Sequence, residues 1–145
     1  MTTSNLYAAA AAIVFFWSGA VVSISFLEAW LKFTAPGVTL PIGLSIGRLV
    51  FSALNKVEWV LLVGCMTCGL AGVAGWWKGA IWLWMAASVL VVETFWLLPA
   101  LDARALAYMS GQEPKPSSMH LVFVAAEVVK VGCLITGGIE LFKLI

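Results

Sequence analysis

Residues 80–101 read AIWLWMAASVLVVETFWLLPAL and carry one charged side chain, Glu93, among 22 residues. A helix of this length spans about 33 Å at 1.5 Å per residue, which is enough to cross the ~30 Å hydrocarbon core of a bilayer. Three further runs have the same apolar character: residues 6–33, 49–77 and 119–142. The pattern predicts an all-α fold, an integral membrane four-helix transmembrane bundle, in which residues 1–145 form a single domain.

The composition agrees with this fold. Of the 145 residues, 63% are hydrophobic and 10% are charged, and the mean hydropathy is +1.05. A soluble domain carries about 25% charged residues, so this chain lacks the charge that a water-facing surface needs. The lipid bilayer is therefore the expected partner. A net charge of +1 provides no basic field, and nucleic-acid binding is not expected.

Four spans place both termini on the same side of the membrane. The lysines and arginines outside the deepest part of the spans divide five to two between the sides. Those on the side away from the termini are Lys32, Arg48, Lys56, Arg104 and Lys115, and those on the terminal side are Lys78 and Lys143. The positive-inside rule predicts a multi-pass protein with both termini outside the cytoplasm. Residues 102–118, after Pro99, are predicted to form the one clearly hydrophilic loop.

Each predicted helix carries one glutamate inside its apolar run. These residues are Glu28, Glu58, Glu93 and Glu127. Counting along each helix places all four roughly 8–13 Å below the membrane boundary away from the termini. An ionisable group near the centre of a bilayer costs ~2.5–3.5 kcal/mol on insertion scales, so such groups rarely face lipid. We therefore expect the four carboxylates to form one layer inside the bundle.

Polar neighbours share the helical faces of these glutamates. His120, Glu127 and Lys130 follow one stripe of the fourth helix, with spacings of 7 and 3 residues. The residues expected to tune the charge of the carboxylates are Lys32, Arg48, Asn55 and Lys130. A nearby cation keeps a buried glutamate ionised. The pattern indicates a buried carboxylate–lysine cluster.

This cluster has more than one interpretation. In the favoured one it binds or passes a cation, either a metal ion or a proton, as intramembrane ionisable groups often do. Carboxylates and the His120 imidazole suit a hard or borderline divalent metal, which makes such an ion a candidate cofactor for metal binding or ion transport. Alternatively, the cluster is a structural salt-bridge network in a non-catalytic accessory subunit of a larger membrane complex. A membrane enzyme acting on a lipid or quinone, with Glu127 or His120 as general base, is the least favoured interpretation.

Three cysteines, Cys65, Cys68 and Cys133, lie inside apolar runs, where a disulfide framework is not expected. The segment Cys65-Met66-Thr67-Cys68 lies in the middle of a helix and is followed by glycines. This setting favours a small-residue packing face. A soft-metal path for Cu(I) or a similar ion, formed by the three thiols and Met66, is the alternative. A homo-oligomer, or a larger membrane partner docked on the glycine faces, is also left open.

Several features are similar to those of the copper-resistance-D-like superfamily of small four-helix membrane proteins. They are the four short spans, Ser18-Gly19-Ala20 in the first helix, the corner from Pro99 to Arg104, His120 at the start of the fourth helix, and Gly132, Gly137 and Gly138. The resemblance covers most of the chain and implies metal handling or an auxiliary membrane role. The metal- or haem-binding histidines of that family are mostly absent here.

Overall fold

The computed structural model describes residues 2–72, 76–112 and 114–145, and it contains helices but no strand in that part of the chain. The elements are α1 (Thr3–Val21), the π-helical segment η1 (Val22–Glu28), α2 (Ala29–Leu31), the 3-10 segment η2 (Lys32–Thr34), α3 (Leu40–Gly72), α4 (Trp77–Val92), the π-helical segment η3 (Glu93–Leu97), α5 (Leu98–Met109) and α6 (Met119–Phe142). Four continuous helical stretches of these residues are long and apolar enough to cross a membrane: Thr3–Thr34, Leu40–Ala71, Trp77–Met109 and Met119–Phe142. The predicted all-α fold with four such helices is confirmed.

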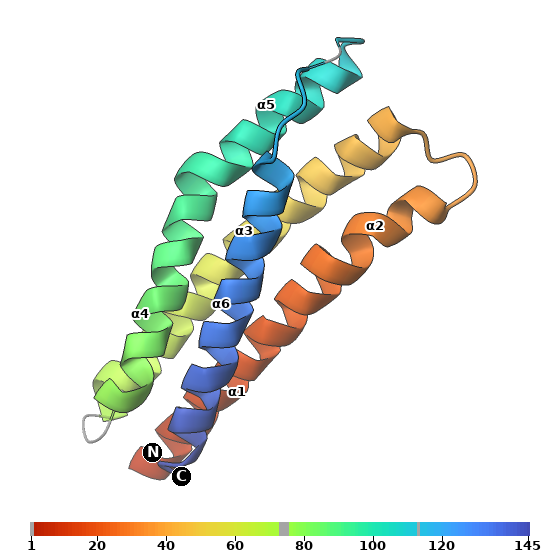
Figure 1. The fold of residues 1–145 in the computed structure, drawn as a ribbon. Coiled ribbons are helices and arrows are strands. Elements are labelled where there is room, and N and C mark those ends of the chain that lie inside the picture. Colours follow the sequence, from red (N-terminus) through yellow and green to blue (C-terminus); the bar gives the residue numbers. More distant parts are fainter. Residues whose placement is uncertain (1, 73–75, 113) are drawn as a thin grey trace.

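The long helices run up and down in an elongated bundle (Figure 1). The N- and C-termini lie together at one end, where the Ser4 hydroxyl donates a 3.4 Å hydrogen bond to the Ile145 carbonyl oxygen. We call this the terminal end. At the opposite end, the loop before α3 and the helix α5 diverge from each other (Figure 1). We call this the open end and define it as residues 29–55 and 94–120.

The terminal half of the bundle has an apolar core. Its fully buried side chains include Val14, Leu83, Leu90, Leu134 and Leu141 from α1, α4 and α6, and Cys65 from α3. Glycines allow α4 and α6 to approach closely. A Cβ atom added at Gly137 would lie 3.1 Å from the Cβ atom of Trp82 and 3.6 Å from the carbonyl oxygen of Gly79. Close packing through small residues is typical of helices in membranes.

The helix boundaries differ from the predicted ones at the open end. The second long helix begins at Leu40, ahead of the span predicted at residues 49–77 and at the start that Pro41 in the sequence allows. Pro41 lies in its first turn, where the missing N–H costs no hydrogen bond. The third long stretch runs past residue 101 to Met109, so the first half of the predicted loop 102–118 is helical. The sequence Gly75-Trp76-Trp77-Lys78-Gly79 predicts a turn between the second and third spans. This segment lies partly outside the described residues, and α4 begins within it at Trp77.

Pro99 does not end the third long helix because the backbone hydrogen bonds change register just before it. In η3 the Leu98 N–H donates to the carbonyl oxygen of Glu93, five residues back. A proline removes one donor and crowds the preceding turn of a regular α-helix. Pro99 instead stands in the first turn of α5, directly after the π-helical turn. The helix therefore continues and carries Asp102 and Arg104 towards the open end.

Candidate functional site

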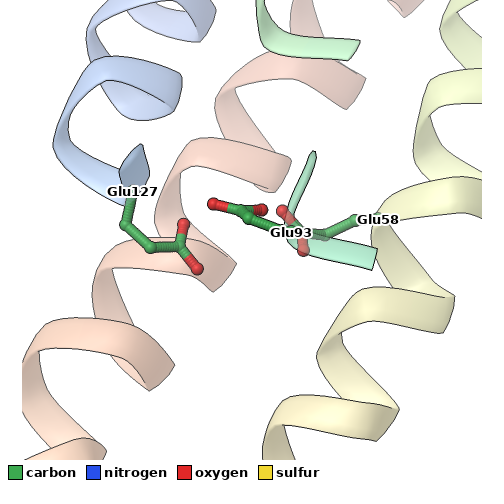
Figure 2. A group of neighbouring side chains, drawn as sticks. All are labelled: Glu58, Glu93 and Glu127. Carbon is green, nitrogen blue, oxygen red and sulfur yellow. The ribbon is translucent and has the colours of Figure 1, made fainter. Parts of the chain in front are cut away.

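One ammonium group lies among three carboxylates in the interior of the bundle. The Nζ atom of Lys130, from α6, lies 2.6 Å from Glu58 Oε1, 2.5 Å from Glu93 Oε2 and 2.9 Å from Glu127 Oε2. No side chain of the four is more than 3% exposed. Figure 2 shows the three carboxyl groups pointing towards one another from α3, η3 and α6. We call Glu58, Glu93, Glu127 and Lys130 the glutamate–lysine cluster.

The first long helix supplies neutral hydrogen-bond donors to this cluster. The indole Nε1 of Trp17 donates to Glu58 Oε1 over 2.9 Å. The hydroxyl of Ser25 donates to Glu127 Oε1 over 3.0 Å. Both side chains are buried. All four long helical stretches therefore meet at the cluster, three through its charged members and one through these two donors.

Negative charge exceeds positive charge in the cluster. Three ionised carboxylates and one ammonium would leave a net charge of −2 (−3 + 1). Among the described residues, none donates a hydrogen bond to Glu93 Oε1 or Glu127 Oε2, although Glu127 Oε2 lies within ion-pair distance of Lys130. Removing an uncompensated charge from water costs several kcal/mol. The arrangement therefore favours the uptake of further positive charge.

Two π-helical turns lie at this level of the bundle. The segment η1 carries Ser25, and η3 begins at Glu93. In each segment the closing hydrogen bond reaches five residues back, from Ala29 to Ile24 and from Leu98 to Glu93. Such turns are rare and often occur at functional sites. Their coincidence with the cluster supports a role beyond simple packing.

The cluster also contains a group of side chains that could hold a metal ion. Among the described residues, Glu58, Glu93 and Glu127 are the one group of three or more His, Cys, Asp or Glu side chains whose ligand atoms lie within 4.8 Å of one another. The ammonium of Lys130 already contacts one oxygen of each. A divalent ion at the same oxygens would be repelled by that ammonium. The geometry is better suited to a proton, which needs no shell of ligands.

The fourth predicted carboxylate lies outside the cluster. Glu28 accepts a 3.1 Å salt bridge from Lys32, one helical turn away. Arg48, another predicted charge-tuning residue, forms a two-point salt bridge with Asp102, in which Nη2 lies 3.1 Å from Oδ2. Of the predicted charge-tuning residues, Lys130 alone forms salt bridges with the clustered glutamates.

Asn55 and its neighbours form a polar contact beside the cluster. The amide of Asn55 donates to the Thr94 hydroxyl oxygen over 2.9 Å, and the indole of Trp59 donates to the same oxygen over 3.1 Å. Asn55 precedes Glu58 by three residues, and Thr94 follows Glu93 directly. This polar contact therefore lies at the boundary of the open end, next to the cluster residues in the sequence.

Trp17 and Thr94 are site residues that the sequence analysis did not identify. Trp17 precedes Ser25 by eight residues, or about two helical turns, so both lie on one face of the first long helix. That spacing could have identified Trp17 as a site residue from the sequence. The acceptor role of the Thr94 hydroxyl had no such signal, since the sequence does not reveal which polar group of a neighbouring helix it meets.

A cavity of about 680 Å³ opens at the open end. Its polar lining residues are Lys32, Arg48, Ser52, Asn55, Thr94, Asp102, Arg104, Tyr108, Ser117 and His120. His120, predicted as a ligand candidate, is exposed and lines this cavity rather than joining the carboxylates. Two of the lining residues are neighbours of the clustered glutamates in the sequence, since Asn55 precedes Glu58 by three residues and Thr94 follows Glu93 directly. None of the four cluster residues lines the cavity itself.

The cysteines lie apart from the charged residues. Cys65 and Cys133 belong to the apolar core, and Cys68 packs against it. The Cys65 thiol is 3.9 Å from the carbonyl oxygen of Ala10. The three thiols do not form a group of ligands within reach of a single ion. Cys65 and Cys133 therefore take part in the apolar packing between the helices, and the small-residue packing face stays a prediction.

Comparisons of the chain with models of protein families, with curated proteins and with solved structures give no match. The likeness to the copper-resistance-D-like superfamily therefore stays a prediction. The function has to be inferred from the cluster and the cavity.

Proposed function

We propose that this chain is an integral membrane protein whose glutamate–lysine cluster binds protons. The observation that carries the proposal is the contact of one buried ammonium, that of Lys130, with three buried carboxylates. The cation expected from the sequence is then H⁺, and Glu58, Glu93 and Glu127 are the groups that hold it. Lys130 stabilises the carboxylates that stay ionised.

The outer surface of the helices supports a membrane location. Large apolar side chains project outward and are largely uncovered: Leu49 is 72% exposed, Val60 71%, Leu70 78%, Phe95 74% and Phe142 66%. Exposure of such a surface to water is unfavourable, whereas the hydrocarbon of a bilayer would cover it. With the basic residues of the open end on the cytoplasmic side, both termini lie outside the cytoplasm.

A proton fits the cluster better than a metal ion for two reasons. Carboxylates this close together cannot all ionise unless cations balance them, and one ammonium balances only one. A proton also needs just one free oxygen atom, and Glu93 Oε1 has no hydrogen-bond donor or ion-pair partner among the described residues. A metal ion would need several oxygens that Lys130 already contacts.

Access to the cluster is one-sided. Towards the open end, Asn55 and Thr94 provide polar groups next to the cavity. Towards the terminal end, the apolar side chains of Val14, Leu83 and Leu134 fill the bundle. Protons therefore exchange with the open end and do not cross. Protonation of a carboxylate weakens its attraction to Lys130, so the proposed role is to couple pH to the contact between helices.

Infrared spectroscopy of the purified protein tests proton binding, because a protonated carboxyl has a C=O stretch distinct from that of a carboxylate. We expect this band near neutral pH, with a shift in deuterated water. Glu93→Gln should remove or shift it. Glu140→Gln is the matched control, since Glu140 pairs with Lys143 near the terminal end and outside the cluster. The absence of any protonated carboxyl across the physiological pH range would refute the proposal.

Elemental analysis separates the proton from a metal ion. We expect no stoichiometric divalent metal in the purified protein. If the wild type holds a stoichiometric metal and the Glu58→Gln, Glu127→Gln double variant does not, the cation that the cluster binds is that metal ion and not a proton.

The structural network is the second candidate, and the salt bridges of Lys130 favour it, because they join α3, η3 and α6. In that case the glutamine variants lower stability but no carboxyl titrates. A membrane protein that co-purifies in stoichiometric amount would then support the accessory-subunit role.

A further inference from the structure

The cavity at the open end has an excess of positive charge. Arg48 and Asp102 neutralise each other through their two-point salt bridge. Arg104 also lines the cavity, but no described carboxylate pairs with it. Its hydrogen bond is a 3.0 Å contact from Nη2 to the backbone carbonyl oxygen of Lys115. The guanidinium group has five N–H donors, so most of them remain for a ligand.

A second cation is held in the wall of the same cavity. The side chain of Lys32 is only 9% exposed, and its Nζ lies 5.5 Å from the ring centroids of both Phe33 and Phe51. A Cβ atom at Gly47 would lie 3.2 Å from this Nζ. The lack of a side chain at Gly47 therefore leaves room for the ammonium against α3. Glu28 accepts one of the three N–H groups. The other two can contact a ligand.

The rest of the lining is mostly apolar. The large apolar side chains are those of Phe33, Leu44, Phe51, Leu98 and Leu101. A volume of about 680 Å³ falls within the range of about 300–1,000 Å³ that is usual for small-molecule sites. An apolar cavity with two incompletely paired cations and the imidazole of His120 matches a molecule with a charged head and an apolar chain.

We propose that this cavity binds an amphiphile with an anionic head and a hydrocarbon chain. Arg104, Lys32 and His120 contact the head, and Leu44, Phe51 and Leu98 contact the chain. A carboxylate and a phosphate monoester share the chemistry that these donors recognise. Both are therefore tested as heads.

The height of the cavity in the bundle agrees with this ligand. Arg104 follows Glu93 by eleven residues, which places it about 16 Å farther towards the open end. In the membrane location proposed above, this is the level of the lipid head groups. The inference rests on that location but not on proton binding by the cluster.

Binding is measured on the full chain in an uncharged detergent, by native mass spectrometry and by displacement of a fluorescent polyene fatty acid. The probes are a long-chain carboxylate, a single-chain phosphate monoester, the alcohol of the same chain length, and inorganic phosphate. We expect saturable binding of at least one anionic amphiphile, binding of the alcohol at least about tenfold weaker, and no binding of inorganic phosphate, because a charge-assisted hydrogen bond and the chain contacts are both needed.

Arg104→Gln should weaken binding of the anionic amphiphile about tenfold, since it removes the charge of the head-group contact. Lys115→Gln is the matched control, because Lys115 is an exposed cation nearby whose side chain does not line the cavity. A second variant, Ser52→Trp, fills the cavity without changing its charge and should also weaken binding. The thermal midpoint of each variant is measured to show that it is folded.

The proposal is overturned if the alcohol binds as tightly as the acids, if inorganic phosphate alone displaces the probe, or if Lys115→Gln weakens binding as much as Arg104→Gln. Glu93→Gln, which tests proton binding, should leave the affinity for the amphiphile unchanged within about twofold, because Glu93 does not line the cavity. Failure of one proposal is therefore distinguishable from failure of the other.

Discussion

The terminal half and the middle of the bundle are held together by different interactions. In the terminal half, Leu83 and Leu134 pack in a dry core, and Gly79 and Gly137 bring α4 and α6 together. At mid-bundle, Lys130 joins three helices through charge. Apolar packing is spread over many weak contacts, so the loss of one is tolerated. A charge cluster depends on its balance, and removal of its one cation, Lys130, leaves all three carboxylates without an ion-pair partner.

The largest effect is expected for Lys130→Met. This change leaves three buried carboxylates without their cation, and breaking a buried ion pair typically costs about 3–5 kcal/mol. We expect at least that loss in the free energy of unfolding, measured by chemical denaturation in detergent, or failure to accumulate folded protein. A variant as stable as the wild type would show that the cluster does not depend on charge balance.

A compensated variant separates charge balance from packing at the same position. Lys130→Met combined with Glu58→Gln, Glu93→Gln and Glu127→Gln has no charge left in the cluster. Replacing a buried ionic group by uncharged residues of similar volume is often neutral. We therefore expect this variant to recover most of the lost stability. If it is no more stable than Lys130→Met alone, shape rather than charge controls the site.

Trp17→Phe should have the next largest effect. It removes the indole N–H that donates to Glu58 Oε1 over 2.9 Å. A hydrogen bond to a charged group contributes about 1.5–3 kcal/mol, and the smaller ring also leaves a void. The measurement is the same unfolding titration. Trp84→Phe is the control, because Trp84 is 61% exposed on the outer surface. This variant should lose little free energy of unfolding. Equal losses in the two variants would contradict the role given to Trp17.

Gly137→Val tests the terminal half. The added Cβ would lie 3.1 Å from the Cβ atom of Trp82, so α4 and α6 would have to separate. Overpacking of a close contact costs about 1–3 kcal/mol. Gly132→Val, on the same helix, is the matched control because a Cβ there meets no atom within 4 Å. If both variants unfold at the same denaturant concentration, close approach at Gly137 does not stabilise the bundle.

Much of this arrangement follows from counting along the sequence. The four helices were predicted because the free energy of transferring apolar side chains adds up over about 20 residues. The common depth of Glu58, Glu93 and Glu127 in the bundle followed from the helical rise per residue, which depends little on the sequence of the helix. Lys130 was identified because it follows Glu127 by three residues and so lies on the same face.

The parts that could not be predicted depend on the π-helical turns and on contacts between helices. Ser25 and Glu28 would share a face in a regular α-helix, but the wider turn of η1 separates them. Ser25 meets Glu127, whereas Glu28 pairs with Lys32. Similarly, Pro99 predicts a helix end only if the backbone hydrogen bonds before it are those of a regular α-helix. Sequence periodicity assumes that regularity and therefore misses both features.

The smallest effect is expected for Glu28→Gln, at the open end. Glu28 is 28% exposed, and its partner Lys32 keeps the contacts of its ammonium with Phe33 and Phe51. Helical salt bridges between residues four apart are worth about 0.3–0.5 kcal/mol and weaken with added salt. We expect a loss of that order in the unfolding titration, and a smaller one in high salt. Glu140→Gln, which removes a similar pair with Lys143, should give a comparable loss. A salt-independent loss as large as that of Lys130→Met would mean that Glu28 is buried with the cluster in the membrane, and that the contrast between mid-bundle and open end does not exist.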